Sequence, residues 1–168
     1  MWNYMEVTTP FAYGDPTSYQ KGIAFLDGHG LIEDWGCGVC FAKLFVHNSE
    51  YRGIDSSRSK FVDVVADLAS YRSQPDCIFM RHVLEHNWTW PTILENALAS
   101  FRDRMALIIF TPFAETTTEI AHVNGICELS LNRTEVQKAL EPFAVRREEI
   151  TSQTRYGAEV LFYIERKE

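Results

Sequence analysis

Short β-forming runs alternate with helical stretches through the middle of this chain, and that alternation is the strongest constraint on its fold. The segment 76–81 is apolar in its interior, which is typical of a strand covered on both faces. Pro91 suits the first turn of a helix, and apolar residues recur on one helical face up to Phe101. The expected strands are 31–35, 50–54, 62–66, 76–81 and 105–111, and the expected helices are 39–47 and 91–101. Strands alternating with helices predict an α/β fold with a mainly parallel sheet and helices on both faces.

Both ends of the chain depart from this alternation. Near the N-terminus, one helix is expected over residues 15–26. Near the C-terminus, Asn132-Arg-Thr-Glu135 resembles a capping box that opens a further helix. Residues 143–151 and 159–165 have the pattern of two strands joined by a short turn. The sequence therefore predicts a Rossmann-like sheet of seven strands, mainly parallel and closed by a C-terminal antiparallel hairpin.

The length of the chain limits the number of domains. Its 168 residues suffice for one domain with its own hydrophobic core, and are too few for two ordinary domains. No internal repeat or linker-like tract divides the sequence. We therefore expect a single domain over residues 1–168, in which a helical N-terminal segment, 1–28, precedes a Rossmann-like core, 29–168.

Composition argues against several classes of protein. The 16 basic and 23 acidic residues give a formal net charge of −7, whereas proteins that bind long nucleic acids usually carry a basic surface. The longest apolar run, 105–110, is far too short to span a membrane, and the N-terminus lacks the pattern of a secretory signal. The four cysteines suggest no disulfide framework, so a reduced, cytoplasmic compartment is expected.

Acidic residues lie at or just beyond the ends of three of the expected strands. Asp34 precedes Gly36 and Gly38, where glycines let backbone approach a ligand closely and a helix start offers free N–H groups. Asp55 ends the second strand, where nucleotide-binding α/β proteins hold the ribose hydroxyls. Asp67 follows the third strand at a place suited to the edge of an adenine. Together these residues predict a site for a nucleotide-containing cofactor.

Four motifs resemble those of class I S-adenosylmethionine-dependent methyltransferases, in the same order and at the same spacing. They are Ile32-Glu-Asp34-Trp-Gly36-Cys-Gly38, Tyr51-Arg-Gly-Ile-Asp55, Ala66-Asp67-Leu68 and His82-Val-Leu-Glu-His86. The resemblance runs from about residue 16 to the C-terminus and implies S-adenosyl-L-methionine as the cofactor. The cofactor-binding residues that it implies are Asp34, Gly36, Cys37, Gly38, Asp55, Ser56, Asp67, Leu68, Arg81 and His82.

The resemblance also implies how these residues meet the cofactor. The two glycines would pack against its methionine part, with Asp34 hydrogen-bonding nearby, and Asp55 would hold both ribose hydroxyls. Asp67 and the backbone of Leu68 would meet the adenine. Arg81 and His82 would pass beside the methionine ammonium group.

The pair Cys37-Gly-Val-Cys40 matches the spacing of redox and zinc motifs. A redox role leaves the three acidic residues unexplained, and no second pair at this spacing completes a zinc site. Cys40 also stands where the methyltransferase family usually has a third glycine. A nicotinamide-binding dehydrogenase is a further alternative, but Phe41 occupies the last glycine position of its G-x-G-x-x-G motif.

The segment His82-Val-Leu-Glu85-His86 matches the H-x-x-E-H pattern of inverted zinc peptidases. It lies directly after a strand and before a helix that begins near Pro91, so a regular helix through it is not expected. Glu85 and His86 can instead anchor the turn by hydrogen bonds. We therefore expect no metal in this protein.

Methyl transfer from a sulfonium needs aligned reactants and, for some acceptors, a general base. Histidine suits that task near neutral pH. The expected catalytic residues are His82, His86 and His122, and the expected substrate-binding residues are Tyr13, Tyr19 and Trp88. A small molecule is the favoured methyl acceptor. A protein or nucleic-acid acceptor, and a non-catalytic cofactor-binding module or subunit, remain as alternatives.

Overall fold

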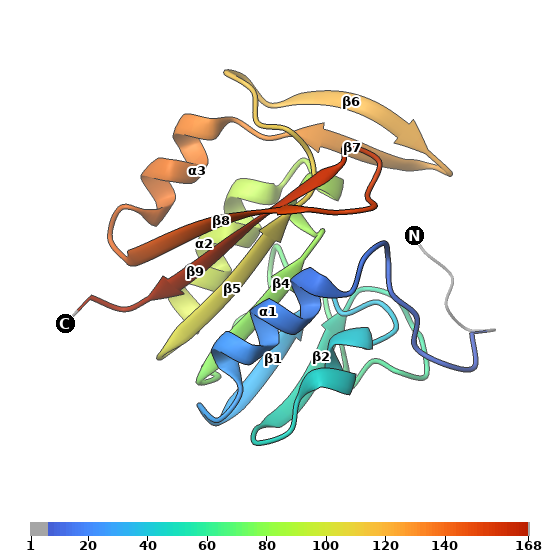
Figure 1. Ribbon diagram of the computed structural model, residues 1–168, viewed down its shortest axis with the longest axis vertical. Coiled ribbons are helices and arrows are strands. Elements are labelled where there is room, and N and C mark those ends of the chain that lie inside the picture. Colours follow the sequence, from blue (N-terminus) through green and yellow to red (C-terminus); the bar gives the residue numbers. More distant parts are fainter. Residues whose placement is uncertain (1–6, 168) are drawn as a thin grey trace.

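The computed structural model describes residues 7–167 and forms three layers, with a sheet between two layers of helices (Figure 1). The strand order of the seven-stranded sheet is β3-β2-β1-β4-β5-β9-β8. Its strands are β1 (Leu31–Trp35), β2 (Glu50–Asp55), β3 (Val64–Val65), β4 (Cys77–Arg81), β5 (Arg104–Ile109), β8 (Ala144–Thr151) and β9 (Ala158–Glu165). The helices are α1 (Thr17–Leu26), α2 (Trp90–Ser100) and α3 (Arg133–Leu140), with two short 3₁₀ segments, η1 (Phe41–Phe45) and η2 (Leu84–His86).

The pairing of the strands confirms the predicted fold class. Strands β1 to β5 pair in parallel, whereas β9 runs antiparallel to both β5 and β8. The predicted hairpin at the C-terminus therefore forms the far edge of the sheet. No helix among the described residues is long and apolar enough to cross a membrane.

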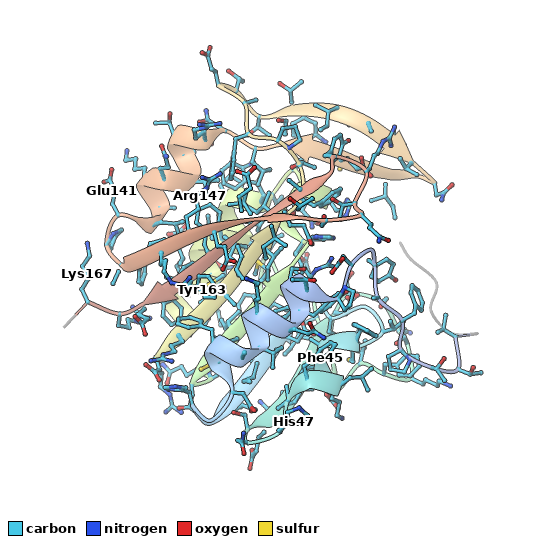
Figure 2. All side chains as sticks on the ribbon, in the orientation of Figure 1. Phe45, His47, Glu141, Arg147, Tyr163 and Lys167 are labelled. Atoms are coloured by element: carbon cyan, nitrogen blue, oxygen red, sulfur yellow. The ribbon has the colours of Figure 1, made fainter. Side chains whose placement is uncertain are left out.

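Each face of the sheet is covered by its own helical layer, as the sequence predicts. Helix α1 and segment η1 cover one face, where Ile23 and Leu26 are fully buried against Phe79. On the same side lies Tyr163, which is labelled in Figure 2. The centroid of its ring is 5.1 Å from that of Phe25. Helices α2 and α3 cover the other face, where Leu94 and its neighbours pack on the central strands.

The predicted helix over residues 39–47 is wrong, because the structure has only the short 3₁₀ segment η1 there. Cys40 adopts a left-handed conformation with φ +55°, which delays the start of the segment. Its end follows from Asp27, whose carboxylate accepts hydrogen bonds from the backbone N–H groups of His47 and Asn48. These contacts turn the chain toward β2 before a longer helix can form.

The sequence analysis missed a separate two-stranded hairpin, β6 (Thr118–Val123) and β7 (Ile126–Ser130). It lies beyond the carboxyl ends of the parallel strands (Figure 1). Asn124 and Gly125 form its turn with φ values of +52° and +82°, the conformation that favours an Asn-Gly pair in two-residue hairpins. That dipeptide was the signal in the sequence that could have revealed the hairpin.

The predicted capping box at the start of α3 is present. The Asn132 side chain accepts a hydrogen bond from the backbone N–H of Glu135 at 3.1 Å. Replacing Asn132 with alanine should lower the free energy of unfolding by about 1 kcal/mol, because that N–H loses its partner. Chemical denaturation would measure the change. The exposed Thr134 in the first turn offers a control, and Thr134→Ala should change stability by less than about 0.5 kcal/mol. Equal effects of the two substitutions would contradict the capping role.

Candidate cofactor and active site

Two cavities open at the edge of the sheet where the parallel strands end. The first has a volume of about 440 Å³ and the second about 340 Å³. Gly36, His82 and His86 line both cavities, so the two spaces meet at these residues. A molecule longer than either cavity would cross this junction.

The first cavity collects the residues predicted to meet a nucleoside. Its lining includes Asp55, Ser56, Asp67 and Leu68, from the ends of β2 and β3. Leu68 is buried, while Asp67 is exposed at the rim. Tertiary structure thus brings together side chains that the sequence places after separate strands.

Asp55 also holds its own loop together. Its Oδ2 accepts a hydrogen bond from the backbone N–H of Gly38 at 2.9 Å, and its Oδ1 accepts one from Ser57 at 2.7 Å. Each carboxylate oxygen can accept more than one hydrogen bond, so this arrangement leaves acceptor capacity for a ligand. Asp55 therefore combines a structural role with its place in the cavity.

The glycine turn after β1 needs glycine for steric reasons. Gly36 has φ +79°, and a Cβ atom built there would lie 2.3 Å from Cγ2 of Val83. Beneath the turn, the sulfur atoms of Cys37 and Cys40 lie 2.9 and 2.6 Å from the position of a Cβ at Gly53. These two cysteines are free thiols that fill the space beside a glycine, and a hydrogen bond with Cys40 together with burial raises the pKa of Cys37.

Asp34 lies on the wall of the second cavity with 3% of its surface exposed. The hydroxyl group of Tyr51 donates a hydrogen bond of 2.6 Å to its Oδ2. Burial raises the pKa of Asp34 to about 7, although this hydrogen bond and the charge of Arg81 act in the opposite direction. A cationic ligand group beside Asp34 would favour the ionised carboxylate.

Arg81 and His82, at the end of β4, share one buried carboxylate that the sequence analysis missed. Oε1 of Glu159, from β9, lies 2.7 Å from Nη2 of Arg81 and 2.5 Å from Nε2 of His82. Arg81 also donates to Ser18 and to the backbone carbonyl of Tyr13. No local pattern around Glu159 distinguishes it from any other glutamate in a strand.

The charge state of this cluster follows from burial and pairing. Burial disfavours the charge on Glu159, but the hydrogen bond from His82 and the charge of Arg81 outweigh it and lower the pKa of Glu159. Burial lowers the pKa of His82 to about 4, and the hydrogen bond to Glu159 offsets this only in part. Near neutral pH, His82 is therefore a neutral imidazole that donates from Nε2.

His86 is held in one tautomer by the β6–β7 hairpin. Its Nδ1 lies 2.8 Å from the carbonyl oxygen of Cys127, which can only accept a hydrogen bond. In the neutral ring, Nδ1 therefore carries the proton and Nε2 keeps its lone pair.

The neighbouring Glu85 is fully buried and accepts a hydrogen bond from the backbone N–H of Phe110, so it anchors the turn. Burial raises the pKa of Glu85 to about 7.

The other predicted site residues also line one of the two cavities. His122, on β6, is largely exposed, lines the first cavity and pairs with Glu119 at 2.9 Å. Trp88 lines the same cavity with 58% of its surface exposed. Tyr13 and Tyr19 line the second cavity, and the guanidinium of Arg81 lies 4.0 Å from the ring centre of Tyr19.

The H-x-x-E-H segment does not form a regular helix, because residues 84–86 are a single 3₁₀ turn. No group of three or more histidine, cysteine or acidic side chains in the described part of the chain is arranged to hold a metal ion.

The second cavity is also lined by Phe110 and Arg155. The ring centroid of Phe110 lies 4.5 Å from that of His82, and Arg155 lies on the β8–β9 turn. Neither was singled out from the sequence.

No protein-family model matches this chain, and no curated protein matches it by sequence. Solved structures, in contrast, match about nine-tenths of it. One is the 1,6-didemethyltoxoflavin-N1-methyltransferase of Burkholderia thailandensis, with bound 1,6-didemethyltoxoflavin and S-adenosylhomocysteine. It shares 14% sequence identity at a TM-score of 0.70, over 91% of this chain and 80% of the other.

Two further solved structures match this chain with TM-scores above 0.6. The magnesium protoporphyrin IX methyltransferase of Synechocystis, with bound S-adenosylhomocysteine, has 16% identity and a TM-score of 0.63, over 90% of this chain and 83% of its own. The N-methyltransferase NodS of Bradyrhizobium japonicum has 11% identity and a TM-score of 0.64, and the match covers 90% of this chain and 85% of NodS. The chain therefore has the fold of the class I S-adenosylmethionine-dependent methyltransferases, as the sequence motifs predict.

The raised pKa of Asp34 predicts how stability depends on pH. A carboxyl group whose pKa is higher in the folded than in the unfolded protein contributes most stability below its unfolded pKa, and loses that contribution as the pH rises through its folded pKa. Asp34→Asn stays neutral at every pH. Its stability relative to the native protein should therefore rise between about pH 4 and pH 7, by at most about 1.4 kcal/mol per pH unit, and then level off. Urea denaturation across that range measures the difference, and a flat difference would contradict the assignment.

Proposed function

We propose that this protein transfers a methyl group from S-adenosyl-L-methionine to a small-molecule acceptor, and that residues 1–168 act as one methyltransferase domain. The observation that carries the proposal is the junction of the two cavities. Groups suited to a nucleoside lie on one side of it, and a buried carboxylate suited to an ammonium group lies on the other. The methyltransferase fold surrounds both.

The residues that line the first cavity are complementary to the ribose and the adenine of the cofactor. In our proposal, Asp55 accepts hydrogen bonds from the ribose hydroxyls, with Ser56 beside it. Asp67 and Leu68 lie against the adenine. These residues occupy the ends of neighbouring parallel strands, where ligands of open α/β sheets generally bind.

The methionine part would extend into the second cavity. It passes over Gly36, Cys37 and Gly38, and its ammonium group pairs with Asp34. Arg81 and His82 lie on the same wall. This placement puts the sulfur atom near the junction of the two cavities.

When bound, S-adenosyl-L-methionine supplies a methyl group that is activated by the positive sulfur. The contribution of the protein is to align the acceptor and to exclude water. We propose His86 as the main general base, because its Nε2 keeps a lone pair and its ring lines both cavities. His82 offers Nδ1 at the same junction, and His122 offers a more exposed ring nearby.

Several features favour a small acceptor. Tyr13, Tyr19 and Phe110 line the part of the second cavity beyond the junction, and Trp88 borders the first cavity. The net charge of −7 disfavours extended nucleic acid as the acceptor. The didemethyltoxoflavin and magnesium protoporphyrin methyltransferases described above are named for small molecules. A protein acceptor and a non-catalytic binding module remain the alternatives, and a cytoplasmic location remains a prediction.

Cofactor binding tests the proposal directly. S-adenosylmethionine and S-adenosylhomocysteine should each bind one to one and raise the melting temperature through linkage, while nicotinamide dinucleotides should not. Isothermal titration calorimetry and thermal denaturation measure both effects. Tight binding of a dinucleotide, together with no response to either methionine nucleoside, would refute the proposed cofactor. Binding followed by methyl transfer to an identified acceptor would separate the enzyme from the non-catalytic module.

Asp55 provides a sharper test of the proposed pose. Charge-assisted hydrogen bonds to two ribose hydroxyls predict that Asp55→Ala weakens cofactor binding by about 2–4 kcal/mol, or roughly 30- to 1000-fold. Because Asp55 also binds the N–H groups of Gly38 and Ser57, stability should fall by about 1 kcal/mol as well.

A matched control separates these two effects. Asp63 accepts a hydrogen bond from the backbone N–H of Gly53 at 2.7 Å but lines neither cavity. Asp63→Ala should therefore lower stability and leave cofactor affinity within about twofold of the native value. Unchanged affinity in a folded Asp55→Ala protein would show that the ribose does not bind there.

A further inference from the structure

Glu159 is a buried acid that belongs to the site without lining it. Its side chain has no exposed surface, and it contributes to neither of the two cavities. Its Oε1 nevertheless accepts three hydrogen bonds, from Oγ of Ser18 at 3.0 Å, Nη2 of Arg81 at 2.7 Å and Nε2 of His82 at 2.5 Å. Glu159 therefore acts on the site only through its neighbours.

A second buried glutamate shows what a purely structural arrangement looks like. Oε1 of Glu33 accepts hydrogen bonds from Arg52 and Tyr71, and its Oε2 accepts from Trp35 and Ser73. Both oxygens are therefore paired, and Glu33 lines neither cavity.

Glu159 differs from Glu33 in how its oxygens are used. Within residues 7–167, its buried Oε2 has no hydrogen-bond partner, and all three donors crowd onto Oε1. An unpaired buried carboxylate oxygen is unfavourable for stability. Unlike the partners of Glu33, two of the donors to Glu159, Arg81 and His82, line the second cavity.

The second cavity has opposite charges on the same wall. Asp34 and Arg81 both line it, and both side chains are almost fully buried. Two buried opposite charges on one cavity wall attract each other unless another partner holds one of them. Glu159 is that partner for Arg81, and it draws the guanidinium toward Ser18 and the carbonyl of Tyr13.

We propose that Glu159 is a positioning residue that holds Arg81 away from Asp34, so that Asp34 stays available for the ammonium group of the cofactor. The inference rests on the proposed function, because it takes the ligand to be an α-amino-acid nucleoside. It concerns the methionine end, because Arg81 lines only the second cavity, whereas His82 lines both cavities at their junction. A ligand without the amino-acid part should therefore respond much less to Glu159 than a ligand that carries it.

Two ligands and three variants test this role. S-adenosylhomocysteine carries the amino-acid part, and 5′-methylthioadenosine lacks it. In Glu159→Gln, Arg81 is free to pair with Asp34, so affinity for S-adenosylhomocysteine should fall roughly tenfold, while affinity for 5′-methylthioadenosine changes less than about twofold. In the double variant Glu159→Gln/Arg81→Met, no cation competes for Asp34, and affinity for S-adenosylhomocysteine should recover part of the loss seen in Glu159→Gln. Glu33→Gln is the control and should lower thermal stability without separating the two ligands.

Several outcomes of the calorimetry would overturn the positioning role of Glu159. An equal loss for both ligands in Glu159→Gln, or no loss for either, would overturn the positioning role. So would a double variant that binds S-adenosylhomocysteine no better than Glu159→Gln, because the effect would not pass through Arg81. If Glu159→Gln does not fold, Glu159→Asp keeps the charge but shortens its reach, and it should show a smaller loss confined to S-adenosylhomocysteine. A native protein that binds neither ligand would instead refute the proposed function.

Discussion

The parallel pairing of β1 with β2 on one side and β4 on the other is the constraint on which the site depends. Trp35 lies opposite Ile54, and Asp34 lies opposite Phe79, so the three strands end at the same level. The N–H groups of Gly36 and Cys37 both donate to the carbonyl oxygen of Ile54, which keeps the glycine turn against the end of β2. Backbone hydrogen bonds thus determine the distances between side chains that are far apart in sequence.

Several ionisable side chains are buried at this edge of the sheet. Asp34 and Glu85 are buried, and burial raises the pKa of each to about 7. Glu159 and Arg81 are buried as well, and they are compatible with the core because they form a hydrogen-bonded ion pair. Folding alone would be better served by apolar residues at such positions. Asp34 and Arg81 line the second cavity, and Glu159 bonds to His82 at the junction, which is the physical argument that this edge binds a ligand.

The agreement between sequence and structure is best where the signals are local. Apolar periodicity predicted the central strands and the helix after Pro91, because burial on one or both faces leaves a pattern in adjacent residues. The segment 39–47 was predicted wrongly, because the left-handed conformation of Cys40 and the remote contacts of Asp27 outweigh helix propensity there. The Asn124-Gly125 turn was a local signal that the analysis overlooked.

The sequence by itself determined the order of the seven strands of the main sheet and of the three α-helices, the glycine turn, and the acidic residues at the strand ends. All of these depend on the chemistry of neighbouring residues. Only the tertiary structure decided which groups those residues meet. Glu159 reaches His82 across 77 positions of the chain, and the carbonyl of Cys127 orients His86 across 41. Such contacts leave no periodic trace, because they depend on how the last strands and the β6–β7 hairpin pack against the end of β4.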